Sequence, residues 1–205
     1  MKNKLAIIGA SGHGKVCVDV AYHMKRWDEI VFLDSKKVGS SVLSFEVIDL
    51  SDNWKQYIDE YDLFIALGDN KIRERIFNEI SNSNASIATL IHPSTVIGLE
   101  VEIGVGSFVA AGAVINPSTS IGDGVIISTG STVDHDSQVK DFVHISPGAH
   151  LAGAVQVGRR TWIGIGGVIK NNISIGADVV VGAGGVVVRD IEEAGTYVGV
   201  PVRGV

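Results

Sequence analysis

The sequence predicts two architectures in one chain of 205 residues: a small α/β unit followed by a triangular solenoid of parallel β-strands. Glycine is unevenly distributed, because residues 1–90 hold five glycines and residues 91–205 hold the other 20. Branched aliphatic residues recur with a period of six through residues 91–192. Apolar runs alternate with helical patterns before residue 85, as in a parallel sheet with helical crossovers. We therefore expect one domain over residues 1–85 and another over 86–205.

Three short apolar runs in the first part are expected to form buried parallel strands. They cover residues 5–8, 30–34 and 63–68. Helical spacing follows over residues 16–24 and again over 71–80, where Asp69 or Asn70 can cap the helix. This strand–helix–strand order predicts a small Rossmann-like parallel sheet with right-handed crossovers.

The solenoid prediction rests on seventeen consecutive hexads that begin at Ile91. The first position of every hexad is Ile, Val or Leu, and the fifth position is always Thr, Val, Ser, Ala, Gly or Ile. An amphipathic helix cannot produce this pattern, because six is not a multiple of 3.6. Three hexads would close one triangular coil, with the aliphatic side chains pointing inward.

Composition excludes several classes of protein. Seventeen basic residues against 23 acidic ones give a net charge of −6 without a basic cluster, so nucleic acid is not expected as a partner. The sequence has no apolar run long enough to span a bilayer and no signal-peptide pattern, so we expect no membrane insertion and a cytoplasmic location. Cys17 is the single cysteine, which excludes an internal disulfide and a thiolate metal cage.

His135 is the most informative of the six histidines. It occupies the third, turn position of its hexad and is therefore expected to point outward, between Asp134 and Asp136. A neighbouring carboxylate can fix the tautomer of an imidazole and raise its basicity. These are the properties of a general base, although a solvated turn without catalytic function fits the same residues.

A second candidate site lies where the first expected strand meets the first expected helix. Gly9, Gly12 and Gly14 follow the strand, so backbone N–H groups and a helix N-terminus could receive phosphate oxygens. Asp34 ends the next strand and could accept hydrogen bonds from a ribose or a base. A tight turn without a ligand and an NAD site are the alternatives, although residues 1–90 provide too few strands for a complete dinucleotide fold.

Four features together resemble a known family. They are the hexads, the segment Ile8-Gly9-Ala10-Ser11-Gly12-His13-Gly14, the segment Asp134-His135-Asp136 with His144 downstream, and the tail Gly199-Val200-Pro201. In these features the chain resembles the hexapeptide-repeat acyltransferases, and among them the PglD-like, sialic-acid-cluster branch of nucleotide-sugar N-acetyltransferases. The resemblance implies a left-handed parallel β-helix, an N-terminal nucleotide-sugar-binding domain and a homotrimer.

The resemblance also implies an activity. Acetyl-CoA would be the co-substrate, no metal would be needed, and the acceptor would be the 4-amino group of a nucleotide-linked 4-amino-4,6-dideoxysugar, with UDP favoured. His135 would be the base, tuned by Asp134 or Asp136 where the family usually has Glu. The residues implied to bind acetyl-CoA are His144, Gly153, Ile165 and Ala183, and those implied to bind the nucleotide sugar are Ser11, Gly12, His13, Asp34, Ser35 and Gly68.

Some positions depart from the family or constrain the mechanism. Ser128 stands where close relatives often carry Asn, which leaves its role open. Cys17 is far in sequence from the hexads, so a covalent acetyl-cysteine is not expected. His144 lies half a coil beyond His135, so within one prism the two should face roughly opposite sides and meet only through a neighbouring subunit. Five of the basic residues fall in 159–205, where they could receive the phosphates of coenzyme A.

Three other functions fit the same sequence. A sialic-acid-type sugar O-acetyltransferase would use the same apparatus on a hydroxyl group. A γ-carbonic-anhydrase-like enzyme would hold zinc with His135, His144 and His150. A non-catalytic scaffold would bind the sugar nucleotide without transferring an acetyl group.

Overall fold

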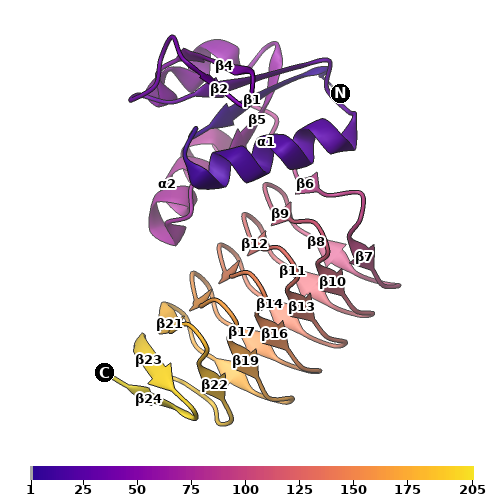
Figure 1. Cartoon of the computed structure of the whole chain (residues 1–205), viewed down its shortest axis with the longest axis vertical. Coiled ribbons are helices and arrows are strands. Elements are labelled where there is room, and N and C mark those ends of the chain that lie inside the picture. Colours follow the sequence, from indigo (N-terminus) through magenta and orange to yellow (C-terminus); the bar gives the residue numbers. More distant parts are fainter. Residues whose placement is uncertain (1) are drawn as a thin grey trace. The chain divides into compact units, whose positions relative to one another are not determined.

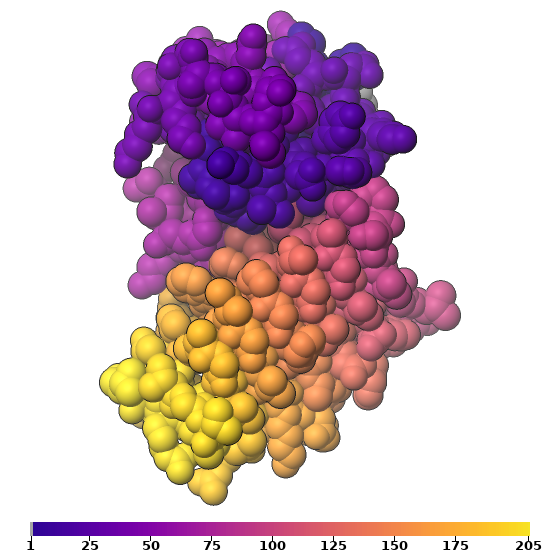
Figure 2. Space-filling view, in the orientation of Figure 1, coloured from indigo at the N-terminus to yellow at the C-terminus, as the bar shows by residue number. Residues whose placement is uncertain are grey.

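The computed structural model describes residues 2–205 and divides the chain into two compact units. The first unit ends at Pro93, and the second comprises Ser94–Val205. Figure 1 labels the elements of both units, and Figure 2 shows their surfaces coloured along the chain. Within residues 2–205, no helix combines the length and the hydropathy required to span a bilayer.

The first unit is an α/β domain built on one five-stranded sheet (Figure 1). Its elements are β1 (Lys4–Ile8), α1 (Gly12–Met24), β2 (Glu29–Leu33), β3 (Ser41–Val42), β4 (Phe45–Asp49), the 3₁₀ helix η1 (Ser51–Tyr57), β5 (Tyr61–Ile65), α2 (Asn70–Ser81) and β6 (Leu90–Ile91). The strand order in the sheet is β3-β4-β2-β1-β5, parallel except for β3. The predicted parallel sheet is therefore confirmed, and the β3–β4 hairpin is an addition to it.

Burial explains why the apolar runs form the centre of this sheet. Leu5, Ile7 and Ile8 of β1 are at most 1% exposed, and strands on both sides pair with β1 in register. Asp69 caps α2, because its carboxylate accepts a hydrogen bond of 2.8 Å from the Ile72 N–H. Of the two cap residues that the sequence allowed, Asp69 is the one in use.

The second unit is a left-handed parallel β-helix, as the hexads predicted. Its strands are β7 (Val96–Ile97), β8 (Glu102–Ile103), β9 (Phe108–Val109), β10 (Val114–Ile115), β11 (Ser120–Ile121), β12 (Ile126–Ile127), β13 (Thr132–Val133), β14 (Gln138–Val139), β15 (His144–Ile145), β16 (His150–Leu151), β17 (Gln156–Val157), β18 (Trp162–Ile163), β19 (Val168–Ile169), β20 (Ser174–Ile175), β21 (Val179–Val181), β22 (Val186–Val187), β23 (Gly195–Gly199) and β24 (Val202–Gly204). From β7 to β22 every third strand joins the same sheet, so three sheets form the faces of the prism. At the end of the chain β23 pairs with β21, and β24 pairs antiparallel with β23.

The register repeats once per coil, which confirms that three hexads close each coil. Ser120 pairs with Gln138 and then Gln138 with Gln156, and the other two faces repeat in the same way. The first hexad positions fill the interior, where Val133 and Ile145, for example, are 0% exposed. The exceptions lie in the first hexads, where Ile97 is 41% exposed and Ile91 and Ile103 are partly exposed.

Each turn of the prism contains one residue with left-handed backbone. From Glu100 to Gly184, the fourth position of every hexad has a φ between 56° and 72°. Glycine occupies about half of these positions because it adopts positive φ without strain, but Asp136 has a φ of 59° as well. Glycine at the second position has another cause: a Cβ at Gly158 would lie 2.4 Å from the backbone carbon of Gly176, one coil on.

Buried hydroxyl groups connect successive coils at the corners. Ser107 donates to the Gly122 carbonyl over 2.8 Å and accepts from the Val125 N–H over 3.0 Å. Thr161, at the equivalent corner of a later coil, makes the same pair of bonds to Gly176 and Val179. These hydroxyls satisfy backbone groups that would otherwise be buried without partners, which explains the small polar residues at fifth positions.

The coil spacing predicts the effect of a side chain at a second hexad position. Gly158→Ala should destabilise the protein by about 1–3 kcal/mol, because its Cβ would overlap the Gly176 backbone. Gly130→Asn is the matched substitution, since Gly130 has open space around it and Asn tolerates a φ of 65°. Urea unfolding followed by circular dichroism measures both, and equal midpoints for the two variants would contradict the steric explanation.

Candidate active site

The turn between β13 and β14 presents His135 to solvent. The imidazole is 61% exposed, so it lies outside the prism as its hexad position predicted. The His135 carbonyl accepts a hydrogen bond of 2.8 Å from the Ala154 N–H of the next coil. The backbone beneath this side chain is thus fixed by coil stacking while the ring itself remains accessible.

Asp136 is the direct partner of the His135 ring. Its Oδ2 lies 2.7 Å from His135 Nδ1, and the left-handed backbone of Asp136 turns its carboxylate back toward the preceding residue. This hydrogen bond is the main reason why the pKa of His135 lies above its ordinary value, and the charges of Asp134 and Asp136 add to the effect. With the proton on Nδ1 held by Asp136, Nε2 has a lone pair for a substrate proton.

Asp134 has a different position. Its Oδ1 accepts hydrogen bonds from the His135 N–H over 2.9 Å and from the Asn116 side chain over 2.7 Å. These two bonds hold the pKa of Asp134 below its ordinary value, so it stays ionised. Asp134 therefore fixes the turn and acts on the imidazole through its charge. The sequence left the choice between the two carboxylates open, and the geometry gives the direct contact to Asp136.

Asn116 was not identified from the sequence. It lies one coil before Asp134 and so directly adjacent to it on the prism. Residues 18 positions before and after each candidate are its neighbours on the prism, so a search of those positions would have found this contact.

Gly153 lies against the His135 ring from the other neighbouring coil. A Cβ built on Gly153 would be 2.6 Å from both Nε2 and Cε1 of the imidazole. Any other residue at 153 would displace the ring. The structure thus brings Gly153, one of the predicted acetyl-CoA residues, together with His135, Asp134 and Asp136.

His144 lies elsewhere on the prism. It belongs to β15, in the sheet that contains β12 and β18, and its ring stacks on Trp162 with 5.3 Å between centroids and 4° between planes. Ser128 Oγ is 3.5 Å from His144 Nε2, so Ser128 accompanies His144 and not His135. Trp162 was not identified from the sequence, although it too is one coil from His144.

Ile165 and Ala183 form a third group. They follow β18 and β21 at one corner of the prism, and the Gly184 N–H next to Ala183 donates to the Ile165 carbonyl over 2.7 Å. The Ile165 side chain is 63% exposed. A single chain therefore distributes the four residues predicted for acetyl-CoA over two corners and one face.

In the first unit, the glycine segment forms a tight connection between β1 and α1. Gly9 has a φ of 104°, and a Cβ at Gly14 would lie 2.2 Å from the Gly9 carbonyl oxygen, so the helix begins in close contact with the preceding loop. Ser11 is the N-cap residue but its side chain makes no capping hydrogen bond. Ser11 and Gly12 are both exposed. The first turn of α1 thus faces solvent with N–H groups suited to an anion.

Asp34 connects this loop to the end of β2. Its two carboxylate oxygens accept hydrogen bonds from the Ala10 N–H over 2.8 Å and the Lys36 N–H over 2.9 Å. Ser35 lies next to it, with its hydroxyl 2.7 Å from that of Ser51. Asp34 therefore stabilises the loop and remains beside the residues predicted to hold the nucleotide.

His13 and Gly68 both lie near Arg73, a residue that the sequence did not single out. Burial and the positive charge of Arg73 lower the pKa of His13 to about 4. The Gly68 carbonyl accepts a hydrogen bond of 3.3 Å from the Arg73 guanidinium. His13 is thus neutral at physiological pH, and a neutral imidazole can donate one hydrogen bond and accept another.

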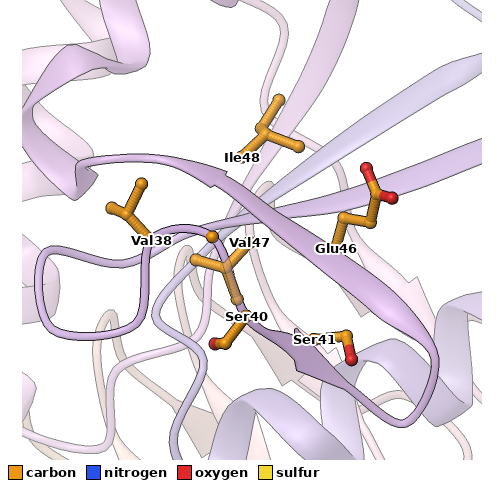
Figure 3. Close-up of a pocket in the computed structure, with 7 residues that line it drawn as sticks. Val38, Ser40, Ser41, Glu46, Val47 and Ile48 are labelled. Atoms are coloured by element: carbon orange, nitrogen blue, oxygen red, sulfur yellow. The ribbon is translucent and has the colours of Figure 1, made fainter.

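A cavity of about 610 Å³ opens beside the β3–β4 hairpin (Figure 3). Its lining residues are Val38, Gly39, Ser40, Ser41, Glu46, Val47 and Ile48. Glu46 is the charged residue among them, and none of the residues predicted for the nucleotide sugar takes part. The residues that line this cavity therefore include no positively charged side chain that would attract a phosphate.

No group of three or more His, Cys, Asp or Glu side chains suited to a metal ion is found within residues 2–205. The three histidines of the zinc alternative are distributed over the turn after β13, β15 and β16. His150 makes its own contact, with Nδ1 3.0 Å from the Thr132 hydroxyl.

The β-helix and the carboxylate-paired, exposed histidine place the chain among the hexapeptide-repeat acyltransferases. A profile of the PglD N-terminal domain matches residues 4–80. The acetyltransferase domain of PglB from Neisseria gonorrhoeae FA1090 is 39% identical, with a TM-score of 0.97 and complete coverage of both chains. The same domain has also been solved with acetyl coenzyme A.

Two further proteins resemble this chain, with sequence identities close to that of the PglB domain. PerB from Caulobacter crescentus, solved with CoA and GDP-perosamine, is 36% identical, with a TM-score of 0.91 and coverage of 98% of this chain and 97% of that one. UDP-N-acetylbacillosamine N-acetyltransferase from Bacillus subtilis (strain 168) is 34% identical over 122 residues, which cover 54% of this chain and 52% of that protein. The match thus spans about half the length of this curated relative. The chain belongs to the PglD-like family of sugar N-acetyltransferases.

The geometry predicts how each carboxylate affects the pKa of His135. Asp136→Asn should lower this pKa, because it removes the hydrogen bond that chiefly raises it. Asp134→Asn should lower it less, because Asp134 acts through its charge alone. Titration of the histidine Cε1–H signals by NMR, with assignment through His135→Ala, measures both shifts. A larger effect of Asp134→Asn would show that the hydrogen bond between Asp136 and Nδ1 is not the dominant contact.

Proposed function

We propose that this protein transfers the acetyl group of acetyl-CoA to the amino group of a nucleotide-linked amino sugar, with His135 as the general base. Family membership supports the acetyltransferase activity and the co-substrate. The observation that carries the residue assignment is the 2.7 Å contact between His135 Nδ1 and Asp136, with the imidazole exposed to solvent. This arrangement leaves Nε2 to accept a proton with raised basicity.

The proposed reaction is a direct transfer. The amine nitrogen of the sugar attacks the carbonyl carbon of the thioester, so that a C–N bond forms and the C–S bond breaks. His135 Nε2 accepts the proton that the amine loses, and coenzyme A leaves as the thiol after receiving a proton. The Gly153 N–H, adjacent to the imidazole, is our candidate donor to the oxyanion of the tetrahedral intermediate.

We propose UDP as the nucleotide and the 4-amino group of a 4-amino-4,6-dideoxysugar as the acceptor. The name of the curated relative from Bacillus subtilis supports UDP, and the GDP-perosamine complex of PerB makes GDP the alternative to test. Ser11, Gly12, His13, Asp34, Ser35 and Gly68 are proposed to bind this substrate. The helix N-terminus at Gly12 supports this assignment, because it can receive a diphosphate.

The basic residues of the later coils contribute unequally to the proposed acetyl-CoA site. Arg159 pairs with Asp141 over 2.7 Å and Arg160 with Asp178 over 2.6 Å, so these two charges are largely compensated. Arg189 and Arg203 instead line a cavity of about 240 Å³ together with Tyr197. We propose that this cavity receives the phosphate-bearing end of coenzyme A.

A homotrimer would complete the site. His135 and His144 lie on different parts of one prism, so a second copy would have to supply the His144 that faces a given His135. Val96 and Val168 are exposed on one face of the prism by 59% and 41%, which supports burial of that face against another copy. His144, Ile165 and Ala183 would then bind acetyl-CoA at the junction of two subunits. We place the activity in the cytoplasm, where acetyl-CoA is available.

The proposed function predicts release of free thiol from acetyl-CoA only when an amino sugar acceptor is present. UDP-, dTDP- and GDP-linked 4-amino-4,6-dideoxysugars are compared at equal concentration, and the UDP-linked sugar should give the highest kcat/KM. The 4-hydroxy analogue of the best acceptor is the control for O-acetylation. The proposal would be overturned if only the hydroxyl analogue supported thiol release. It would also be overturned if none of the three amino sugars supported thiol release.

The mechanism predicts that His135→Ala lowers kcat by roughly 10²–10⁴-fold, because proton removal would depend on solvent. His23→Ala is the matched control, since His23 is an exposed histidine of α1 that contacts Asp19. The same thiol-release assay with the preferred acceptor measures both. A His135→Ala variant with the rate of the parent would remove His135 from the mechanism.

A further inference from the structure

Arg73 is a charged residue with an unusual position in the first unit. It belongs to the first turns of α2, yet it is only 1% exposed. Its Nη1 donates to the carbonyls of Leu67 over 2.9 Å and Gly68 over 3.3 Å, and its Nη2 donates to the Asn70 side chain over 2.8 Å. All three acceptors lie in or next to the connection between β5 and α2. The guanidinium therefore holds this connection, which we name the β5–α2 loop (residues 66–69), in one conformation.

The β5–α2 loop touches the β1–α1 loop that contains Ser11 and Gly12. Strands β1 and β5 are parallel neighbours, so their carboxyl ends lie together, and the Ala66 N–H donates to the Ile8 carbonyl over 2.8 Å. A Cβ at Gly9 would lie 2.9 Å from the Ala66 carbonyl oxygen. A shift of either loop would therefore move the other, and the carboxyl edge of a parallel sheet is where ligands bind in such folds.

The charge of Arg73 is also directed at this edge. Burial lowers its pKa to about 10, which leaves the guanidinium protonated at neutral pH. The nearby His13 is neutral, and the first turn of α1 contains no acidic residue. Asp69 is the nearby carboxylate, and its side chain is engaged at the N-terminus of α2. The loops thus lie over a buried positive charge, which favours an anionic ligand at their surface.

We propose that Arg73 is a positioning residue for the nucleotide sugar: it fixes the β5–α2 loop against the β1–α1 loop and places a buried positive charge behind the diphosphate. This inference rests on the proposed function. The guanidinium of Arg73 is engaged by the β5–α2 loop and Asn70, so its effect should appear in binding of the nucleotide and not in acetyl transfer itself.

The experiment compares Arg73→Gln, Arg73→Lys and Arg75→Gln in the full chain. Arg75 is the matched control because it lies on the same helix, is 71% exposed and pairs with Glu79 on the helix surface. Titration calorimetry with UDP, GDP and dTDP measures binding, and thiol release measures kcat and the KM for acetyl-CoA. Arg73→Gln should weaken binding of the preferred nucleotide by roughly tenfold or more, while kcat at saturating sugar and the KM for acetyl-CoA stay within about twofold.

Arg73→Lys separates charge from geometry. Lysine keeps the positive charge but lacks the planar fork that reaches two carbonyls and Asn70 together, so it should recover only part of the affinity. Nucleotide affinity equal to that of the parent in folded Arg73→Gln would overturn the proposal, and so would equal losses in Arg73→Gln and Arg75→Gln. If Arg73→Gln does not fold, Asn70→Ala takes its place: severalfold weaker binding supports the proposal, and unchanged binding overturns it.

The proposed function and this inference can fail separately. A parent protein that binds a nucleotide but releases no thiol overturns the proposed acetyl transfer, while the Arg73 variants still test the positioning of the nucleotide. A parent protein that transfers acetyl groups, with a nucleotide affinity that Arg73→Gln leaves unchanged, overturns this inference alone.

Discussion

The stacking of coils at an interval of three hexads is the constraint on which the second unit depends. Each residue has one neighbour in the coil before it and another in the coil after it, as the pairing of Ser120, Gln138 and Gln156 shows. Around the candidate base this rule places the Asn116 side chain on Asp134 and Gly153 on the His135 ring. These contacts of the candidate site are therefore assembled by the backbone repeat.

The different contacts of the Asp134 and Asp136 carboxylates follow from the same repeat. Asp136 occupies the left-handed position of its turn, where every hexad bends its backbone, and this bend brings its carboxylate to Nδ1 of the preceding residue. Asp134 lies before the bend and accepts hydrogen bonds from the His135 N–H and the Asn116 side chain instead of from the imidazole. Two chemically identical side chains thus act differently because they lie on opposite sides of one turn residue.

Much of the fold was predictable because its signals are periodic. The hexads predicted the inward residues and the outward position of His135, and the apolar runs predicted the central strands. The β3–β4 hairpin was missed because Leu43 and Ser44 form its turn with φ values of 50° and 70°, without the Asn-Gly or Asp-Gly signature of such turns. Arg73 was missed for another reason: the sequence cannot show that a basic residue on an amphipathic helix turns inward to bind carbonyl groups. Asn116 and Trp162 were missed because neighbours one coil away were not considered. Asn116 lies 18 residues before Asp134, and Trp162 lies 18 residues after His144.

The closure of each coil by three hexads has a consequence for how such a chain can change length in evolution. An insertion or deletion of one complete rung outside residues 116–153 leaves every later side chain on its original face, so the turn that carries His135 keeps its neighbours. Loss of a single hexad between His135 and Gly153 instead rotates all downstream residues by one face of the triangle and moves Gly153 away from His135. Length variation in proteins of this architecture should therefore accumulate in whole rungs outside residues 116–153, because a change of length within that segment would separate Asn116 from Asp134 or His135 from Gly153.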